Sequence, residues 1–240
     1  MRGARRWLVS LTPGERDTVM IRARPFDFPY DGRLVPRQTA VMVIDLQIDF
    51  LSPDGYFAKK GYDPSPLAAI LPTVNRVTRA ARAAGCHIVH TRQGYRADLA
   101  DMTPYEKWRR KRGGLEGTDI LLRSSPGFAI DPRVDRAASD IVIDKTCNGA
   151  FTYTELEHVL RAMDITHLMF TGCTTDVCVH TTLREACDRN FQCLTIEDGC
   201  ASGDAVAHEG ALHMVTVEDG IFGVLATADD VIAGLAQVRD

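Results

Sequence analysis

The chain lacks the features that mark several common protein classes. Its seven cysteines are odd in number and include no CxxC pair, which argues against a disulfide framework and a cysteine-ligated metal. No secretory signal is expected, because the apolar stretch at residues 7–11 is too short for an h-region. We therefore expect reduced thiols in a cytoplasmic protein.

An excess of basic residues is also missing. The formal net charge is −4, and the hydrophobic and charged fractions, 45% and 25%, are those of an ordinary globular protein. No internal repeat or low-complexity segment is present. These absences predict no nucleic-acid partner and no membrane affinity, and 240 residues are enough for one large domain with a full core.

Apolar runs of strand length alternate with helical patterns along most of the chain. Strands are predicted at residues 39–45, 87–91, 140–145, 166–171, 192–198 and 220–225, and helices at 67–84, 154–163, 180–188, 203–217 and 228–236. Near-continuous apolar strands fit a parallel sheet that is covered on both faces. The alternation predicts a single-domain, doubly wound α/β fold within residues 21–240.

Three segments depart from this alternation. Residues 1–20 are predicted to be a flexible tail, with Met20 as an alternative start, and the proline-rich residues 21–38 an irregular arm laid over the domain. Residues 93–130 form an irregular insertion with a basic run at 109–112, for which a solvated face is the default interpretation. Because the insertion follows a strand, a substrate lid or a subunit contact is the alternative.

Chemically active side chains fall at the carboxyl ends of three predicted strands. Asp45 ends the first of these strands, Lys145 ends another, and Cys178 follows a strand and a tight turn at the start of a helix. A parallel sheet brings such ends to one edge. A thiol at a helix N-terminus is favoured as the thiolate, although a small packing residue is the alternative role for Cys178.

These three residues suit catalysis by a nucleophilic thiol. Asp45 can take the thiol proton, and Lys145 can lower the pKa of Asp45 or of the thiol, or bind a developing anion. The alternative is a structural ion pair, but charges gathered at one sheet edge favour a catalytic site. Gln47 and Phe50, which follow Asp45 closely, are expected to bind substrate.

Three stretches carry a resemblance to a known family. Ile44–Phe50, then Lys145, then Thr171–Val179 are similar to the corresponding motifs of the isochorismatase-like cysteine hydrolases. The resemblance covers nearly all of the chain from residue 38. It implies a six-stranded parallel sheet and a catalytic triad of Asp45, Lys145 and Cys178 that forms a thioester intermediate.

The resemblance has further implications for the site and the assembly. It implies a non-proline cis peptide bond just before Thr174 and an oxyanion hole made by the backbone N–H groups of Thr174 and Cys178. Family members commonly form dimers or tetramers, so a homo-oligomer is expected.

Metal binding is not expected. Nicotinamidases of the family carry an Asp-x-His metal pair after the first strand, where this chain has Gln47 and Asp49 and no histidine. His87 and His90 should face opposite ways on a strand. We expect no metal and no other cofactor. Isochorismate is not the expected substrate either, because family members that act on it have no cysteine at the position of Cys178.

Several further stretches resemble the biuret hydrolase branch of the family. These include 29–32, 61–63, 90–92, 98–101, 107–109 and 181–186. The expected function is cysteine-dependent hydrolysis of a C–N bond in a small urea-type amide, biuret or guanylurea, with release of ammonia. Glu218 stands where the biuret branch has glutamine. In the pocket its carboxylate would pair with the guanidinium end of guanylurea, and the alternative is a surface position.

Other functions stay open at this point. Ureidoacrylate and N-carbamoyl-type amidohydrolases share the same chemistry. A non-catalytic, small-molecule-binding member of the fold would be expected to have lost Asp45, Lys145 or Cys178, and all three are present.

Overall fold

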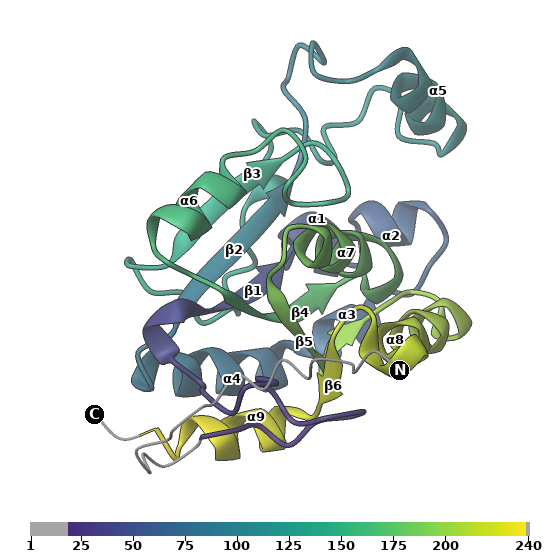
Figure 1. Cartoon of the computed structure of the whole chain (residues 1–240). Coiled ribbons are helices and arrows are strands. Elements are labelled where there is room, and N and C mark those ends of the chain that lie inside the picture. Colours follow the sequence, from purple (N-terminus) through teal and green to yellow (C-terminus); the bar gives the residue numbers. More distant parts are fainter. Residues whose placement is uncertain (1–18, 239–240) are drawn as a thin grey trace, which may run out of the picture.

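The computed structural model describes residues 19–238, and the predicted tail lies almost entirely outside them (Figure 1). Six strands form one sheet in the order β3-β2-β1-β4-β5-β6, and every neighbouring pair is parallel. The strands are β1 (Thr39–Ile44), β2 (His87–Gln93), β3 (Ile141–Lys145), β4 (His167–Cys173), β5 (Gln192–Ala201) and β6 (Val224–Ala226). The predicted doubly wound, six-stranded parallel fold is confirmed.

The helices cover both faces of the sheet. In chain order they are η1 (Pro36–Gln38), α1 (Ile48–Leu51), α2 (Tyr56–Lys59), α3 (Ser65–Ala69), α4 (Leu71–Ala83), α5 (Pro104–Arg112), η2 (Pro126–Phe128), α6 (Leu156–Ala162), η3 (Thr175–Val179), α7 (His180–Asp188), α8 (Ala205–Gly220) and α9 (Ala228–Leu235). Figure 1 shows α4 and α9 together on one face and α6 and α7 on the other.

Strand β1 shows how the sheet builds two cores. Its side chains alternate, so that Val41 and Val43 join the core beneath α4 and α9, whereas Met42 and Ile44 join the core beneath α6 and α7. All six residues of β1 are buried. A strand at the centre of a sheet covered on both faces requires this uninterrupted apolar sequence.

The last predicted strand is shifted in the structure. Residues 220–225 were expected to form it, but α8 extends to Gly220 and β6 begins only at Val224. Gly220 and Gly223 both adopt positive φ, 91° and 102°, which turns the chain between the two elements. The strand therefore starts after the second glycine.

The two segments flanking the regular alternation have defined positions. Within the N-terminal arm, Ile21 and Phe28 form a bridge and are buried, and Arg24 pairs with Leu225 on β6. The insertion at 93–130 contains α5, a helix that the periodicity did not predict. Thr103 caps this helix by accepting a hydrogen bond from the N–H of Glu106.

Candidate active site

Asp45 sits directly after β1, at the carboxyl edge of the sheet. It adopts a left-handed backbone conformation with φ of 51°, and its side chain is completely buried. The hydroxyl of Thr91 on neighbouring β2 donates to Asp45 Oδ1 at 2.6 Å and accepts from the Asp45 N–H at 3.1 Å. One carboxylate oxygen is thereby fixed, and Oδ2 stays directed towards the site.

Lys145 at the end of β3 reaches this second oxygen. Its Nζ lies 2.8 Å from Asp45 Oδ2, and neither side chain is exposed. Nζ also donates to Gln93 Oε1 at 2.7 Å and to the carbonyls of Asn148 and Cys147 at 3.0 and 3.1 Å. Desolvation by burial is the largest single influence and acts to lower the pKa of Lys145, but Asp45 and Cys178 together outweigh it and the pKa is raised.

Cys178 completes the cluster from the other side. Strand β4 ends at Cys173, and Cys178 follows in the single π-helical turn η3, ahead of α7. Its thiol lies near enough to Asp45 and Lys145 for both charges to act on the pKa of the thiol. The structure thus brings together the three residues that the sequence placed at separate strand ends.

The electrostatic environment of Cys178 differs from the sequence-based expectation. A helix N-terminus was expected to favour the thiolate, yet the pKa of the thiol is raised to about 12. Desolvation by burial is the main cause; the Lys145 ammonium opposes it and the Asp45 carboxylate adds to it. Because the residue is only 8% exposed, water cannot stabilise the anion, and the resting group is a neutral thiol.

The turn before Cys178 has the backbone geometry that the resemblance implied. The peptide bond between Cys173 and Thr174 is cis. Within residues 19–238, the N–H of Thr174 has no hydrogen-bond acceptor. A free N–H at this position is suited to receive an oxyanion formed at the thiol.

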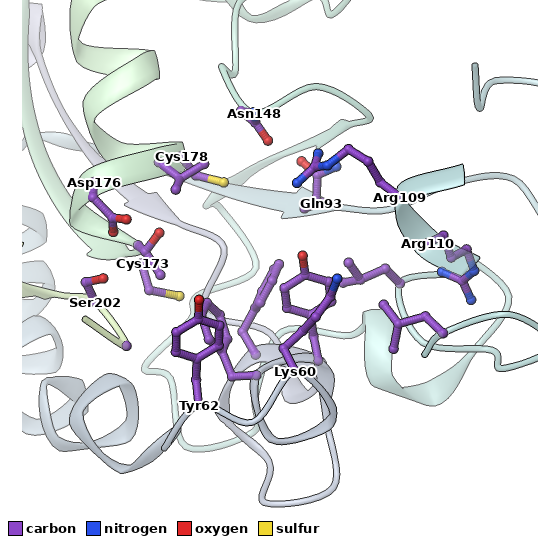
Figure 2. A pocket seen from close by; sticks show the side chains of 18 of the residues that line it. Lys60, Tyr62, Gln93, Arg109, Arg110, Asn148, Cys173, Asp176, Cys178 and Ser202 are labelled. Atoms are coloured by element: carbon purple, nitrogen blue, oxygen red, sulfur yellow. The ribbon is translucent and has the colours of Figure 1, made fainter. Parts of the chain in front are cut away.

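A cavity of about 410 Å³ opens in front of the thiol (Figure 2). Its floor is the sheet edge, with Cys178, Gln93 and Asn148. Aromatic side chains of the segment after β1, including Phe50, form another wall. The remaining lining residues are Tyr56, Phe57, Lys60, Tyr62, Tyr95, Met102, Glu106, Arg109, Arg110, Leu115, Leu121, Cys173, Thr174, Asp176, Val177, Ser202, Gly203, Asp204 and Ala207.

Three cations line this cavity: Arg110, which donates to the carbonyls of Thr118 and Ile120, and in addition Lys60 and Arg109. Arg109 on α5 extends towards the cavity in Figure 2, and Lys60 follows α2 on the opposite side. One nitrogen of Arg109 pairs with Glu106 at 3.0 Å, whereas Lys60 has no carboxylate partner in the described part of the chain. Burial, followed by repulsion from Arg109, lowers the pKa of Lys60.

Sequence reasoning missed these cations as site residues. Arg109 belonged to the basic run whose default interpretation was a solvated face, but the insertion lines the cavity beside the strand edge. A helix signal was available in the Thr103-Pro104 pair, since a capping threonine followed by proline commonly opens a helix. Lys60 carried no recognisable signal.

The three residues predicted to bind substrate have different positions. Phe50 lines the cavity. Gln47 does not, because its side-chain amide donates to the carbonyls of Gln93 and Phe128 and accepts from the Gln93 N–H. Its completely buried side chain therefore fixes the loop after β1, and the expected role in binding is not met.

Glu218 also lies outside the cavity lining. It is exposed, and α8 is interrupted here by the extended residue Val217 and by the left-handed residues Glu218 and Asp219, with φ of 50° and 59°. The expectation that it approaches Cys178 is wrong for this structure, because the helix carries the residue past the cavity and into solvent.

Residues 19–238 contain neither a metal-binding cluster of side chains nor a helix that could span a membrane. No three His, Cys, Asp or Glu side chains are grouped so as to hold a metal ion. No helix combines the length and the apolar character needed to span a membrane.

The family can now be assigned. Residues 39–230 match the isochorismatase domain. The chain belongs to the isochorismatase family. Ureidoacrylate amidohydrolase RutB of Caulobacter vibrioides (strain NA1000 / CB15N) is 30% identical over 231 residues, covering 92% of this chain and 94% of that protein. RutB of Yersinia enterocolitica serotype O:8 / biotype 1B is 30% identical over 90% of this chain and 96% of its own length.

Solved structures agree with this assignment. A cysteine hydrolase from Pseudomonas syringae pv. phaseolicola 1448A superposes with a TM-score of 0.74 at 26% identity, covering 86% of this chain and 96% of its own. A pyrazinamidase/nicotinamidase from Streptococcus mutans UA159, at 22% identity, has a TM-score of 0.66 over 78% of this chain and 99% of its own. The second similarity concerns the fold alone.

Proposed function

We propose that the chain is a cysteine-dependent amidohydrolase that cleaves a C–N bond of a small ureide carrying a carboxylate, as in ureidoacrylate. The observation that carries the reaction is the electrostatic influence of the buried Asp45–Lys145 pair on the Cys178 thiol, which lines the cavity. The names of the related ureidoacrylate amidohydrolases support the bond type.

The first half of the reaction makes a covalent intermediate. As Cys178 sulfur attacks the ureido carbonyl carbon, the thiol proton moves to Asp45 Oδ2. The negative charge passes to the carbonyl oxygen, where the N–H groups of Thr174 and Cys178 stabilise it. Collapse of this species breaks the C–N bond, and the leaving nitrogen takes the proton back from Asp45, which gives a neutral amine and a thioester.

Water completes the cycle. Asp45, again ionised, accepts a proton as water attacks the thioester carbon. The C–S bond then breaks, the acid is released, and the proton returns to the Cys178 sulfur. Lys145 keeps its proton throughout and balances the negative charge that moves between the carboxylate and the sulfur.

The cations that line the cavity support the proposal that the substrate carries a carboxylate. Lys60 and Arg109 are like charges close enough for Arg109 to lower the pKa of Lys60. Glu106, Asp176 and Asp204 also line the cavity, but among the described residues only Glu106 pairs with one of its cations, through one nitrogen of Arg109. An anionic substrate group would relieve the repulsion and form charge-assisted hydrogen bonds.

Biuret and guanylurea fit this cavity less well. A guanidinium end would meet the cations of the cavity, and Glu218, its expected partner, lies in solvent. A neutral biuret would offer no counter-charge to Lys60, which has no carboxylate partner among the described residues. The same reaction at Cys178 could cleave ureidoacrylate, biuret and guanylurea, so the three compounds differ only in how well the cavity binds them.

A substrate panel tests this assignment. Release of ammonia would be measured for ureidoacrylate, its methyl ester, 3-ureidopropionate, biuret and guanylurea. A charge-assisted contact contributes about 1.5–3 kcal/mol, so the acids should exceed the ester and the neutral compounds by about 10- to 100-fold in kcat/KM. Faster turnover of biuret or guanylurea would overturn the carboxylate assignment and leave the amidohydrolase assignment standing.

Variants separate the reaction from recognition. Cys178→Ser should fold normally and lose turnover on every compound of the panel, since Asp45 cannot activate an alcohol of much higher pKa. Substantial residual turnover would refute the role of Cys178 as the nucleophile.

Arg109→Gln should raise KM for the acids by about tenfold or more and leave KM for the neutral compounds unchanged. Arg112→Gln is the matched control, because Arg112 lies on the same helix over Trp108 and outside the cavity.

The assembly stays a prediction. A homo-oligomer, either a dimer or a tetramer, is proposed on the family resemblance, and light scattering after gel filtration would measure it.

A further inference from the structure

The loop that follows β3 holds the ammonium of Lys145 in place. Two of the four acceptors around Nζ are the carbonyls of Cys147 and Asn148 in this loop. The side chain of Asn148 lines the cavity on the same side as Cys178 in Figure 2. A shift of the loop would therefore move both the cation and one wall of the site.

Helix α7, which follows the nucleophile, holds this loop through Thr182. The Thr182 hydroxyl donates to the carbonyl of Cys178 at 2.6 Å and accepts from the N–H of Ala150 at 3.1 Å. Thr182 and Ala150 are both completely buried. One hydroxyl thus joins the backbone of the thiol residue to the backbone of the loop.

Glu185 makes a second connection one helical turn further along α7. Its Oε2 accepts from the N–H of Phe151 at 2.9 Å, and its Oε1 accepts from the hydroxyl of Thr152. A Cβ atom at Gly149 would overlap this carboxylate. The loop therefore lies directly against the end of the Glu185 side chain, which would have to shift if residue 149 carried a Cβ atom.

We infer that Thr182 and Glu185 are positioning residues that set the location of the Lys145 ammonium relative to the Cys178 sulfur. Neither touches the substrate cavity. They act through the loop 146–152, so that the nucleophile and its counter-charge are held by the same helix. The inference rests on the proposed role of Cys178.

Substitutions that remove each connection test the inference. Thr182→Val keeps the shape and loses the hydroxyl, whereas Thr182→Ser retains it. Glu185→Leu removes both acceptors, and Glu185→Gln retains one. Glu157→Gln is the matched control. Glu157 lies on neighbouring α6 and forms surface ion pairs with Arg161 and Arg189.

The expected result is a fall in kcat with little change in KM. Misplacement of a catalytic group by a remote substitution costs up to about 100-fold, so Thr182→Val and Glu185→Leu should lower kcat by about 10- to 100-fold. KM for the ureido acid should change less than about twofold, since Lys60 and Arg109 are untouched. Thr182→Ser and Glu157→Gln should retain nearly full activity.

The folded fraction and the melting temperature are measured alongside. A purely structural role predicts lower melting temperatures with unchanged kcat per folded molecule, and that result would overturn the inference. The same is true if Thr182→Ser fails to restore what Thr182→Val loses. If Cys178→Ser itself retains turnover, the proposed function fails instead, so the two failures are distinguishable.

Discussion

The Nζ atom of Lys145 lies 2.8 Å from Asp45 Oδ2, and both side chains are completely buried. Removing two charges from water costs several kcal/mol for each ion, and their attraction offsets this only while both are present. Asp45 has a further fixed contact from Thr91, and Lys145 has three neutral acceptors. The pair forms a neutral unit in the floor of the cavity.

Breaking this pair should destabilise the protein. Asp45→Asn leaves a buried ammonium without its counter-ion, and we expect the free energy of unfolding to fall by about 3–5 kcal/mol. The double variant Asp45→Asn, Lys145→Met should recover part of the loss, because no unpaired charge is left. Urea unfolding of both variants provides the measurement.

An exposed pair serves as the control for that experiment. Arg76 pairs with Asp229, and the two side chains are 54% and 79% exposed. Arg76→Gln should change stability by less than about 1 kcal/mol. If Asp45→Asn has an effect as small as this, the buried pair does not contribute as described.

The thiol of Cys178 should react slowly at neutral pH. Its pKa is raised to about 12, mainly by burial, so the protonated form predominates far above neutrality. The rate of alkylation of Cys178 by iodoacetamide should rise about tenfold per pH unit up to pH 10, because only the thiolate reacts. The modified peptide would be quantified by mass spectrometry. A plateau below pH 8 would contradict the raised pKa.

The ammonium of Lys145 lowers the pKa of the Cys178 thiol, so replacing Lys145 should change that pKa in a known direction. Lys145→Met should raise the pKa of Cys178 further and slow alkylation at any given pH. Partly exposed Cys187 provides an internal reference in the same digest.

Substrate affinity should weaken early at alkaline pH. Burial and Arg109 lower the pKa of Lys60, so its charge is lost at a lower pH than that of an ordinary lysine, about 10.4. KM for the ureido acid should rise as that charge is lost. Lys60→Arg should remove the rise because a guanidinium stays charged, and Lys60→Met should give a high KM that no longer depends on this ionisation. A KM in the native protein that stays constant to pH 10 would refute the role of Lys60.

Gly172 in β4 should not tolerate a side chain. Its φ is 111°, and a Cβ atom would overlap the backbone of Ile44 on the paired strand β1. Gly172→Ala should cost about 1–3 kcal/mol from the backbone conformation alone, with the overlap adding to it. Gly210→Ala is the control, because that position in α8 faces open space and a helical alanine is favoured by up to about 1 kcal/mol. Equal melting temperatures for the two variants would refute the argument.

The catalytic cluster was the part of the site most accessible from sequence. Asp45 and Lys145 end apolar runs, and a parallel sheet brings strand ends together whatever their separation along the chain. The cavity cations were not accessible in this way. Arg109 lies in a segment without hydrophobic periodicity, where a basic run has no sequence feature to distinguish an exposed face from a cavity wall.

Two sequence-based expectations, the thiolate of Cys178 and the position of Glu218, differ from the structure for the same kind of physical reason. For Cys178 the local effect of the helix start was considered, while burial, which depends on the whole fold, controls the thiol. For Glu218 the position was inferred by alignment, while the extent of α8 and the left-handed residues in it decide where the side chain points. Both depend on tertiary packing rather than on neighbouring residues.

Two parts of the chain with different roles in the proposed reaction contribute to the cavity. Bond cleavage is assigned to residues at the strand ends of the sheet, whereas Arg109 lies on α5, a helix of the insertion that has no buried residue. Substitutions confined to α5 would exchange a group that selects the substrate and leave in place Gln93, which accepts from Lys145. New specificities can thus arise in this architecture by changes to one surface segment, at little cost to the core.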